Sequence, residues 1–205
     1  MFGRINNFRR GIIRNAKRFR QRHFDPFIFI HINKTGGSSI TKALNLDLQH
    51  RTALEKISEL GEQKWQHSYT FAFVRNPWDK VVSHFHYRRR TNKTGLAERP
   101  IEFQDWVQLT YGCQDPTYYD KPKMFMPQTH WISNQNEEII VDFVGRFESL
   151  DQDFEHVCKT IKKHVDLPHI NPSKRKDYRE YYNQNTIEII EKWFHKDIEN
   201  FGYRF

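Results

Sequence analysis

The sequence contains little cysteine and no long apolar run. Cys113 and Cys158 are its two cysteines, and they have neither CxxC nor metal-ligand spacing. This pattern argues against a disulfide framework and agrees with a reducing cytoplasm. No stretch contains the roughly 20 consecutive apolar residues that cross a bilayer, and the N-terminus lacks the apolar core of a secretory signal. We therefore expect a cytoplasmic protein.

Acidic residues are absent from residues 1–24, and this absence accounts for the charge of the chain. The whole sequence has 33 Lys and Arg against 25 Asp and Glu, which gives a formal net charge of +8. Eight of the basic residues lie in residues 1–24, so 25 residues of each sign remain in residues 25–205. This neutral body argues mildly against a strongly polyanionic acceptor, unless the tail helps to hold it.

Apolar residues recur in the same N-terminal tail at steps of three and four. They are Phe2, Ile5, Phe8, Ile12, Ala16 and Phe19. With arginines between them, this spacing predicts a basic amphipathic helix, weakened by Gly11. Such a helix can pack on the body or remain an arm, and basic amphipathic helices also bind anionic membrane surfaces. A nucleic-acid arm or a transit peptide is a further alternative, although we expect no nucleic-acid partner.

Short, continuous apolar runs favour strands that are buried on both faces. We expect three such strands, at 26–32, 69–74 and 139–144. Helical patterns lie between and after them, at 38–46, 52–60, 77–90, 102–110, 149–164 and 186–200. Ser149 and Gln152 have the spacing of a capping box. Strands that alternate with helices, with no internal repeat, predict a single α/β domain with a mainly parallel central sheet flanked by helices.

The first predicted strand ends in a loop that contains a lysine and two glycines. Gly36 and Gly37 let backbone N–H groups approach an anion, and the helix that follows adds its positive N-terminal end. Lys34 adds a full charge. In the nucleoside-triphosphatase loop the lysine follows the glycines, whereas here it precedes them. The sequence therefore predicts a P-loop-like cradle for phosphate or sulfate at the edge of the sheet.

A second group of polar residues follows the second predicted strand. Arg75 lies where that strand ends, and Ser83 lies about two helical turns further along. Both could reach one anion, although an arginine in this place is often a structural ion-pair partner. We expect Asp79 to interact with the N-terminus of the helix. Arg146 and Glu148 are expected to form an ion pair beside the third strand.

The two groups together carry a family resemblance. KTGGSS after one apolar strand and VRNPWDKVVS after the next resemble the sulfotransferases that use 3'-phosphoadenosine 5'-phosphosulfate (PAPS). The similarity is to the branch related to carbohydrate (heparan-type) enzymes, sulfotransferase family 2. It continues through VDFVGRFESLDQDF, INPSKRKDYREYY and DIENFGYRF. The resemblance implies a sulfotransferase domain at 25–205 that moves a sulfuryl group from PAPS to a hydroxyl, without a metal. The acceptor would be a glycan or a small glycoconjugate.

The resemblance also implies roles for individual residues. The 5'-phosphosulfate would be bound by Lys34, Thr35, Gly36, Gly37, Ser38 and Ser39. Lys34 would contact the bridging oxygen that leaves, while Arg75 and Ser83 would bind the 3'-phosphate. A loop that closes over the nucleotide would contain Ser173, Lys174 and Arg175. Two separated anionic groups need two separated clusters of donors, and the planar fork of arginine suits an anion with several oxygens.

The acceptor hydroxyl needs a general base, and histidine is suited to this role near neutral pH. The chain has 11 histidines, so composition does not decide among them. His50 is our first choice because related enzymes often place a histidine before a helix at this point. His67 is second and His31 third. Two other functions stay open, an ATP-dependent kinase and a basic-tailed binding module. A kinase would need the triphosphatase loop order and an acidic Mg²⁺ ligand, and neither is evident.

Overall fold

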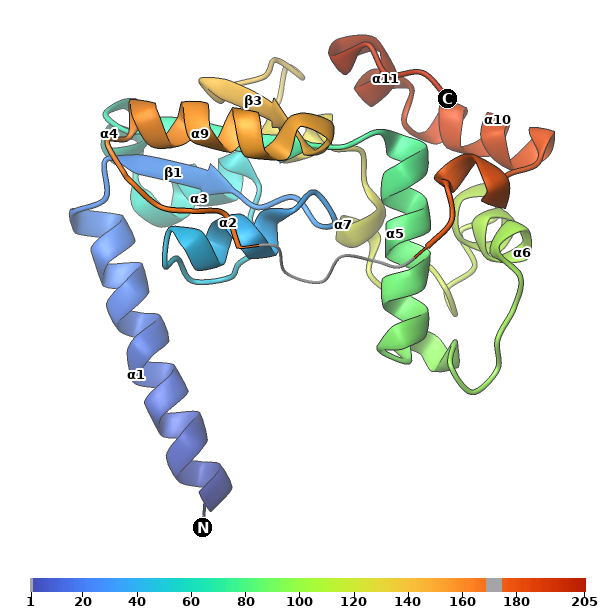
Figure 1. Ribbon diagram of the computed structural model, residues 1–205, viewed down its shortest axis with the longest axis horizontal. Helices are drawn as coiled ribbons and strands as arrows, with labels where there is room; N and C mark the ends of the chain where they lie inside the picture. Colours follow the sequence, from blue (N-terminus) through green and yellow to red (C-terminus); the bar gives the residue numbers. More distant parts are fainter. Residues whose placement is uncertain (1, 169–174) are drawn as a thin grey trace.

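The computed structural model describes residues 2–168 and 175–205, which fold around a parallel three-stranded sheet (Figure 1). Its strands are β1 (Phe27–Ile30), β2 (Tyr69–Val74) and β3 (Phe143–Arg146), in the spatial order β1-β2-β3. Both neighbouring pairs are parallel, with Ile30 opposite Ala72 and Val74 opposite Arg146. The predicted single-domain α/β fold with a mainly parallel sheet and flanking helices is confirmed.

Eleven α-helices surround the sheet in the part of the chain that the structure describes. They are α1 (Phe2–His23), α2 (Gly37–Ala43), α3 (Ala53–Leu60), α4 (Glu62–Gln66), α5 (Pro77–Arg90), α6 (Phe103–Val107), α7 (Pro122–Phe125), α8 (Thr129–Ile132), α9 (Leu150–Thr160), α10 (Gln184–Trp193) and α11 (His195–Phe201). Short 3-10 turns lie at Lys93–Gly95, Phe147–Ser149 and Tyr178–Tyr181, and a π-helical turn lies at Gln108–Gly112.

Alternate side chains of the strands build two separate cores. Phe27, Phe29, Phe71 and Phe73 pack against α2 and α9 on one face, while Ile28, Ile30, Ala72 and Val74 pack against α3, α4, α8 and α11 on the other. This alternation follows from the two-residue period of a strand. The apolar runs look continuous in sequence because both faces are covered.

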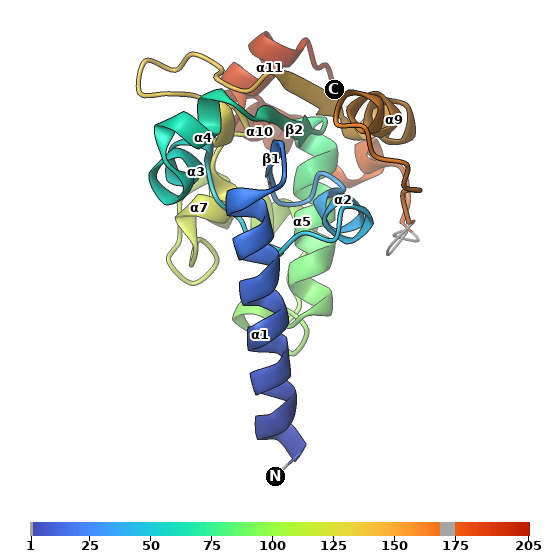
Figure 2. The same cartoon turned by 90° about the vertical axis from the view of Figure 1, so that its left-hand side faces the viewer.

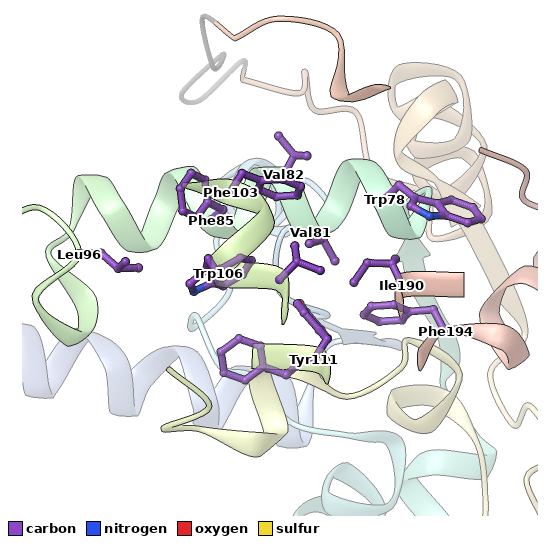
Figure 3. Close-up of a cluster of buried hydrophobic side chains, with 12 residues drawn as sticks. Trp78, Val81, Val82, Phe85, Leu96, Phe103, Trp106, Tyr111, Ile190 and Phe194 are labelled. Atoms are coloured by element: carbon purple, nitrogen blue, oxygen red, sulfur yellow. The ribbon is translucent and has the colours of Figure 1, made fainter. Parts of the chain in front are cut away.

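A third core lies beside the sheet and fixes the position of α5 (Figure 3). Trp78, Val81, Val82 and Phe85 of α5 pack there against α6 and α10, with Trp106 fully buried. The predicted single helix at 186–200 is wrong, because Phe194 leaves helical geometry at φ −107° and ψ 23° and divides it into α10 and α11. The buried Phe194 ring lies 5.8 Å from that of Tyr111.

Two predictions around the third strand are also wrong. Residues 139–142 precede the strand: Ile139 forms an isolated antiparallel bridge with Ser133, and the Asp142 carboxylate accepts hydrogen bonds from the N–H and hydroxyl of Thr70. The Ser149 side chain does not cap α9. It donates instead to the Asp153 carboxylate, at 2.8 Å.

The N-terminal tail forms α1, which leaves the body as a single projecting helix (Figure 1, Figure 2). Gly11 does not interrupt it. Contacts with the body come from its C-terminal turns, where Arg18 pairs with Asp47 at 2.7 Å and Arg20 donates to the carbonyls of Leu44 and Asn45. No helix among residues 2–168 and 175–205 is both long and apolar enough to cross a membrane.

Candidate active site

A cavity of about 1100 Å³ opens where the strands of the sheet end. The segments after β1, β2 and β3 all contribute to its wall, as expected for the carboxyl edge of a parallel sheet. The cavity is lined by His31, Asn33, Lys34, Gly36, Gly37, Ser38, Ser39, Leu48, His50, Arg75, Ser83, His84, His86, Tyr87, Arg88, Arg90, Lys93, Lys121, Met124, Phe147, Leu150 and Arg175. Most of the residues predicted for the donor therefore meet in one place.

The loop between β1 and α2 lines this cavity. Its backbone turns sharply, since both Lys34 (φ 69°) and Gly36 (φ 82°) adopt left-handed conformations. The Thr35 hydroxyl donates to the Ile32 carbonyl at 3.0 Å, and the side chain is fully buried. Thr35 thus holds the loop in shape, and any contact that it makes with an anion would come through its backbone. Ser38 and Ser39 line the cavity at the start of α2.

Gly37 is required because His31 occupies the space that a side chain would fill. A Cβ built on Gly37 would lie 2.0 Å from Cδ2 and 2.3 Å from Nε2 of His31. His31 is itself confined between Phe29, 5.6 Å away between ring centroids, and His50, 4.4 Å away. Burial lowers the pKa of His31 to about 3, so it is neutral at pH 7.

Arg75 is held rigidly between β2 and α5. Its backbone N–H and carbonyl both bind the side-chain amide of Gln128, at 2.9 and 2.8 Å. Its guanidinium donates to Asp79 at 2.7 Å and to the Lys34 carbonyl at 3.1 Å, and it lies 3.8 Å over the Phe147 ring. This bond to Lys34 joins the two predicted donor-binding groups.

Two predicted structural roles near Arg75 need correction. Asn76 caps α5 with its side chain, which accepts from the N–H groups of Trp78 and Asp79. The Asp79 carboxylate is turned toward the cavity side, where it accepts from Arg75 and from Arg175. Glu148 does not pair with Arg146, because it accepts from the N–H of Asn76 and from the Tyr203 hydroxyl.

The Lys34 side chain lies near several other cationic side chains. Its ammonium group is 4.5 Å over the Tyr87 ring. Burial lowers the pKa of Lys34 to about 8, and repulsion by Arg75, Arg90 and Arg175 contributes to the shift. The side chain therefore stays mainly protonated at pH 7, in a cavity that no carboxylate of the described residues lines, and this favours binding of an anion.

His50 has the geometry of a base. Its Nδ1 lies 3.0 Å from the backbone carbonyl of His31. A carbonyl can only accept, so Nδ1 carries the proton and Nε2 keeps its lone pair. Burial, together with repulsion by Lys123 and Lys34, lowers the pKa of His50 below 6.5, which keeps the ring neutral at pH 7. The second candidate, His67, is exposed, binds the Gln63 carbonyl and does not line the cavity.

The C-terminal half of α5 contributes residues that sequence reasoning missed. His86, Tyr87 and Arg90 follow Ser83 at steps of three, four and seven, which places them along one helix face. All four line the cavity, as does the buried His84. Arg88, 3% exposed, donates to Asp120 at 2.7 Å, and its Nε has no partner among the described residues. The helical spacing from Ser83 was the signal that could have identified His86, Tyr87 and Arg90.

The lining of the cavity is strongly cationic. Its charged side chains are Lys34, Arg75, Arg88, Arg90, Lys93, Lys121 and Arg175, and no carboxylate lines it within the described ranges. Seven cations therefore meet at one cavity, so the formal neutrality of residues 25–205 does not describe the local charge here. Ser173 and Lys174 lie outside the described residues. No group of three or more His, Cys, Asp or Glu in the described parts of the chain could hold a metal ion.

The chain is similar to proteins of a known family. A sulfotransferase family model matches residues 17–204. An uncharacterized protein from Archaeoglobus fulgidus is 30% identical over 124 residues, which is 60% of this chain and 92% of that protein. No solved structure matches the chain at a significant level.

Proposed function

The chain belongs to the sulfotransferase family, and from this premise we propose that it transfers a sulfuryl group from PAPS to a carbohydrate hydroxyl. The observation that carries the proposal is the pair of cationic groups at one cavity, joined by the hydrogen bond from Arg75 to the Lys34 carbonyl. PAPS has two separated anionic groups, and each would meet one of them. The loop from Lys34 to Ser39 would bind the phosphosulfate, and Arg75 with Ser83 would bind the 3'-phosphate.

The reaction needs in-line positioning and neutralisation of one leaving oxygen. The acceptor oxygen forms a bond to sulfur while the bond from sulfur to the phosphate oxygen breaks, which leaves adenosine 3',5'-bisphosphate. Lys34 would neutralise the charge that develops on the phosphate oxygen. Nε2 of His50 would take the proton of the acceptor hydroxyl, and Nδ1 would keep its bond to the His31 carbonyl.

The charge of the cavity supports an acceptor that carries carboxylate or sulfate groups. Arg90, Lys93 and Lys121 are exposed cations of the lining and lie outside the residues assigned to the donor. A neutral sugar would leave them without counterions. An acceptor screen with mass detection of transferred sulfate would test this, with neutral and anionic oligosaccharides of the same length. Preference for the neutral series would contradict the proposed acceptor class.

The donor site can be tested by thermal shift with nucleotides. Adenosine 3',5'-bisphosphate should stabilise the protein, and ADP with Mg²⁺ should not. R75A should weaken bisphosphate binding by about 10- to 100-fold, because it removes charged hydrogen bonds to a phosphate. R75K keeps the positive charge but loses the planar fork of donors. Its affinity for the bisphosphate should therefore lie between those of the parent and R75A. R89A is the matched control, since Arg89 is an exposed arginine of α5, the helix that follows Arg75, and does not line the cavity. Stabilisation by ADP with Mg²⁺ alone would contradict the proposal.

The pH dependence of kcat/KM should report the two catalytic groups of the free enzyme. The base must be neutral, and the lowered pKa of His50 places the acidic fall of activity below pH 6.5. Lys34 must be protonated, so activity should fall again as the pH rises through about 8, the pKa of that group. In K34R the alkaline fall should disappear, because guanidinium stays charged. An unchanged alkaline fall in K34R would exclude Lys34 as its cause.

A further inference from the structure

Helix α1 exposes apolar side chains that the body does not cover. Ile12, Ile13 and Phe19 are 54%, 56% and 59% exposed, and Phe24, just beyond the helix, is 70% exposed. Ten large apolar residues are exposed in the described parts of the chain, and four of them lie in this short stretch. Scattered exposed apolar residues are ordinary, but a group on one projecting helix indicates an interaction surface.

One apolar and one basic set of residues lie on opposite faces of the same helix, with Arg9 and Ile13 between them. Ile12, Ala16 and Phe19 recur at steps of four and three and therefore share one face. Arg10, Arg14 and Lys17 have the same spacing, offset by two residues, which places them on the opposite side of the helix. Arg10 and Arg14 are exposed, whereas Lys17 donates to the Leu46 carbonyl at 3.3 Å. With Arg18 and Arg20 also bound to the body, the C-terminal turns anchor the helix.

We propose that α1 binds the surface of an anionic lipid bilayer. An interfacial helix inserts its apolar face at the boundary of the headgroups and acyl chains, while its basic residues attract lipid phosphates. Both the apolar and the basic residues of α1 then contact the bilayer. A nucleic acid would match the arginines but leave Ile12 and Phe19 in water. A second copy of α1 would bring two helices of like charge together, since residues 1–24 contain eight basic and no acidic residues.

The test is co-sedimentation of the full chain with vesicles. Binding is expected with vesicles of phosphatidylcholine and phosphatidylglycerol, and much weaker binding with phosphatidylcholine alone. Added salt should reduce it, because the attraction to anionic headgroups is screened. Equal binding to both kinds of vesicle would overturn the proposal, and so would binding to neither.

Two pairs of variants separate the apolar and the charged contributions. I12Q/F19Q should lower vesicle affinity by roughly tenfold or more, because it removes the inserted side chains. L54Q/V165Q likewise replaces two exposed apolar side chains by Gln, but on the body, and should bind as the parent does. R10Q/R14Q should lower affinity by roughly twentyfold, since each basic residue near an anionic surface adds to binding. K162Q/K163Q, with the same charge change on the exposed turn after α9, should have little effect.

Three further results would overturn the proposal. In the first, I12Q/F19Q and R10Q/R14Q bind vesicles as the parent does. In the second, an RNA or DNA oligonucleotide displaces the protein from vesicles and its own binding is lost in R10Q/R14Q but not in I12Q/F19Q. In the third, I12Q/F19Q abolishes a concentration-dependent dimer in sedimentation and leaves vesicle binding intact.

The substituted side chains are exposed, so unchanged thermal unfolding is expected in every variant. Sulfotransferase activity is a separate readout, because no described side chain of α1 lines the cavity.

Discussion

K34A is expected to lower turnover by about 100- to 1000-fold, the usual effect of removing one donor that stabilises a developing oxyanion. Donor affinity should change by less than about tenfold, because Arg75 and the backbone of the loop remain. Lys34 is well placed for this role, since its ammonium group lies over Tyr87 in a cavity whose lining provides no carboxylate among the described residues. Steady-state kinetics with saturating acceptor would separate kcat from KM for PAPS.

Lys34 has a left-handed backbone, and K34A keeps the Cβ and therefore the same backbone strain. The difference in kcat between the parent and K34A therefore reports the loss of the ammonium group. K42A is the matched control. Lys42 is an exposed lysine of α2 and does not line the cavity, so its loss should leave kcat unchanged. If K34A raised KM for PAPS and left kcat near the parental value, Lys34 would be a binding residue and the leaving oxygen would need another partner.

Much of the fold follows from local signals in the sequence. The strands β1 and β2 are predictable because each is buried on both faces, which leaves a continuous apolar run. The β1–loop–α2 unit and Pro77 at the start of α5 are equally local features. β3 is less predictable, since its four residues include Gly145 and Arg146 and its pairing depends on β2. The break at Phe194 depends on packing against Tyr111, which no local pattern contains.

Within the candidate site, the sequence predicts the residues of the loops that follow the strands, but not their tertiary partners. Lys34 and Arg75 each follow a buried strand, so topology brings them together. The partners of Asp79 and Glu148 were not predictable, because Arg175 and Tyr203 are distant in sequence and converge through the tertiary fold. The buried Asp197 is a similar case. It accepts from the backbone of Gln128 and Thr129 and so fixes the amide that holds Arg75.

G37A is expected to damage both stability and turnover, because no space exists for its methyl group. The added Cβ would lie 2.0 Å from the His31 ring, far inside van der Waals contact. His31 cannot easily yield, since it is buried between Phe29 and His50. Overpacking of this kind costs about 1–3 kcal/mol of unfolding free energy. Any movement of residue 31 also displaces the carbonyl that orients His50, so turnover should fall as well.

Urea denaturation and steady-state turnover of three variants would test this cause. The double variant G37A/H31A should recover part of the stability lost in G37A, because alanine at position 31 makes room for the methyl group. G11A is the matched glycine control: nothing lies within 4 Å of its added Cβ, and alanine favours the helix. G37A with parental stability and turnover would show that the loop accommodates a side chain. If H31A failed to rescue G37A, the clash with His31 would not be the reason for the damage, and the requirement for glycine would lie in the approach of the α2 backbone to the donor.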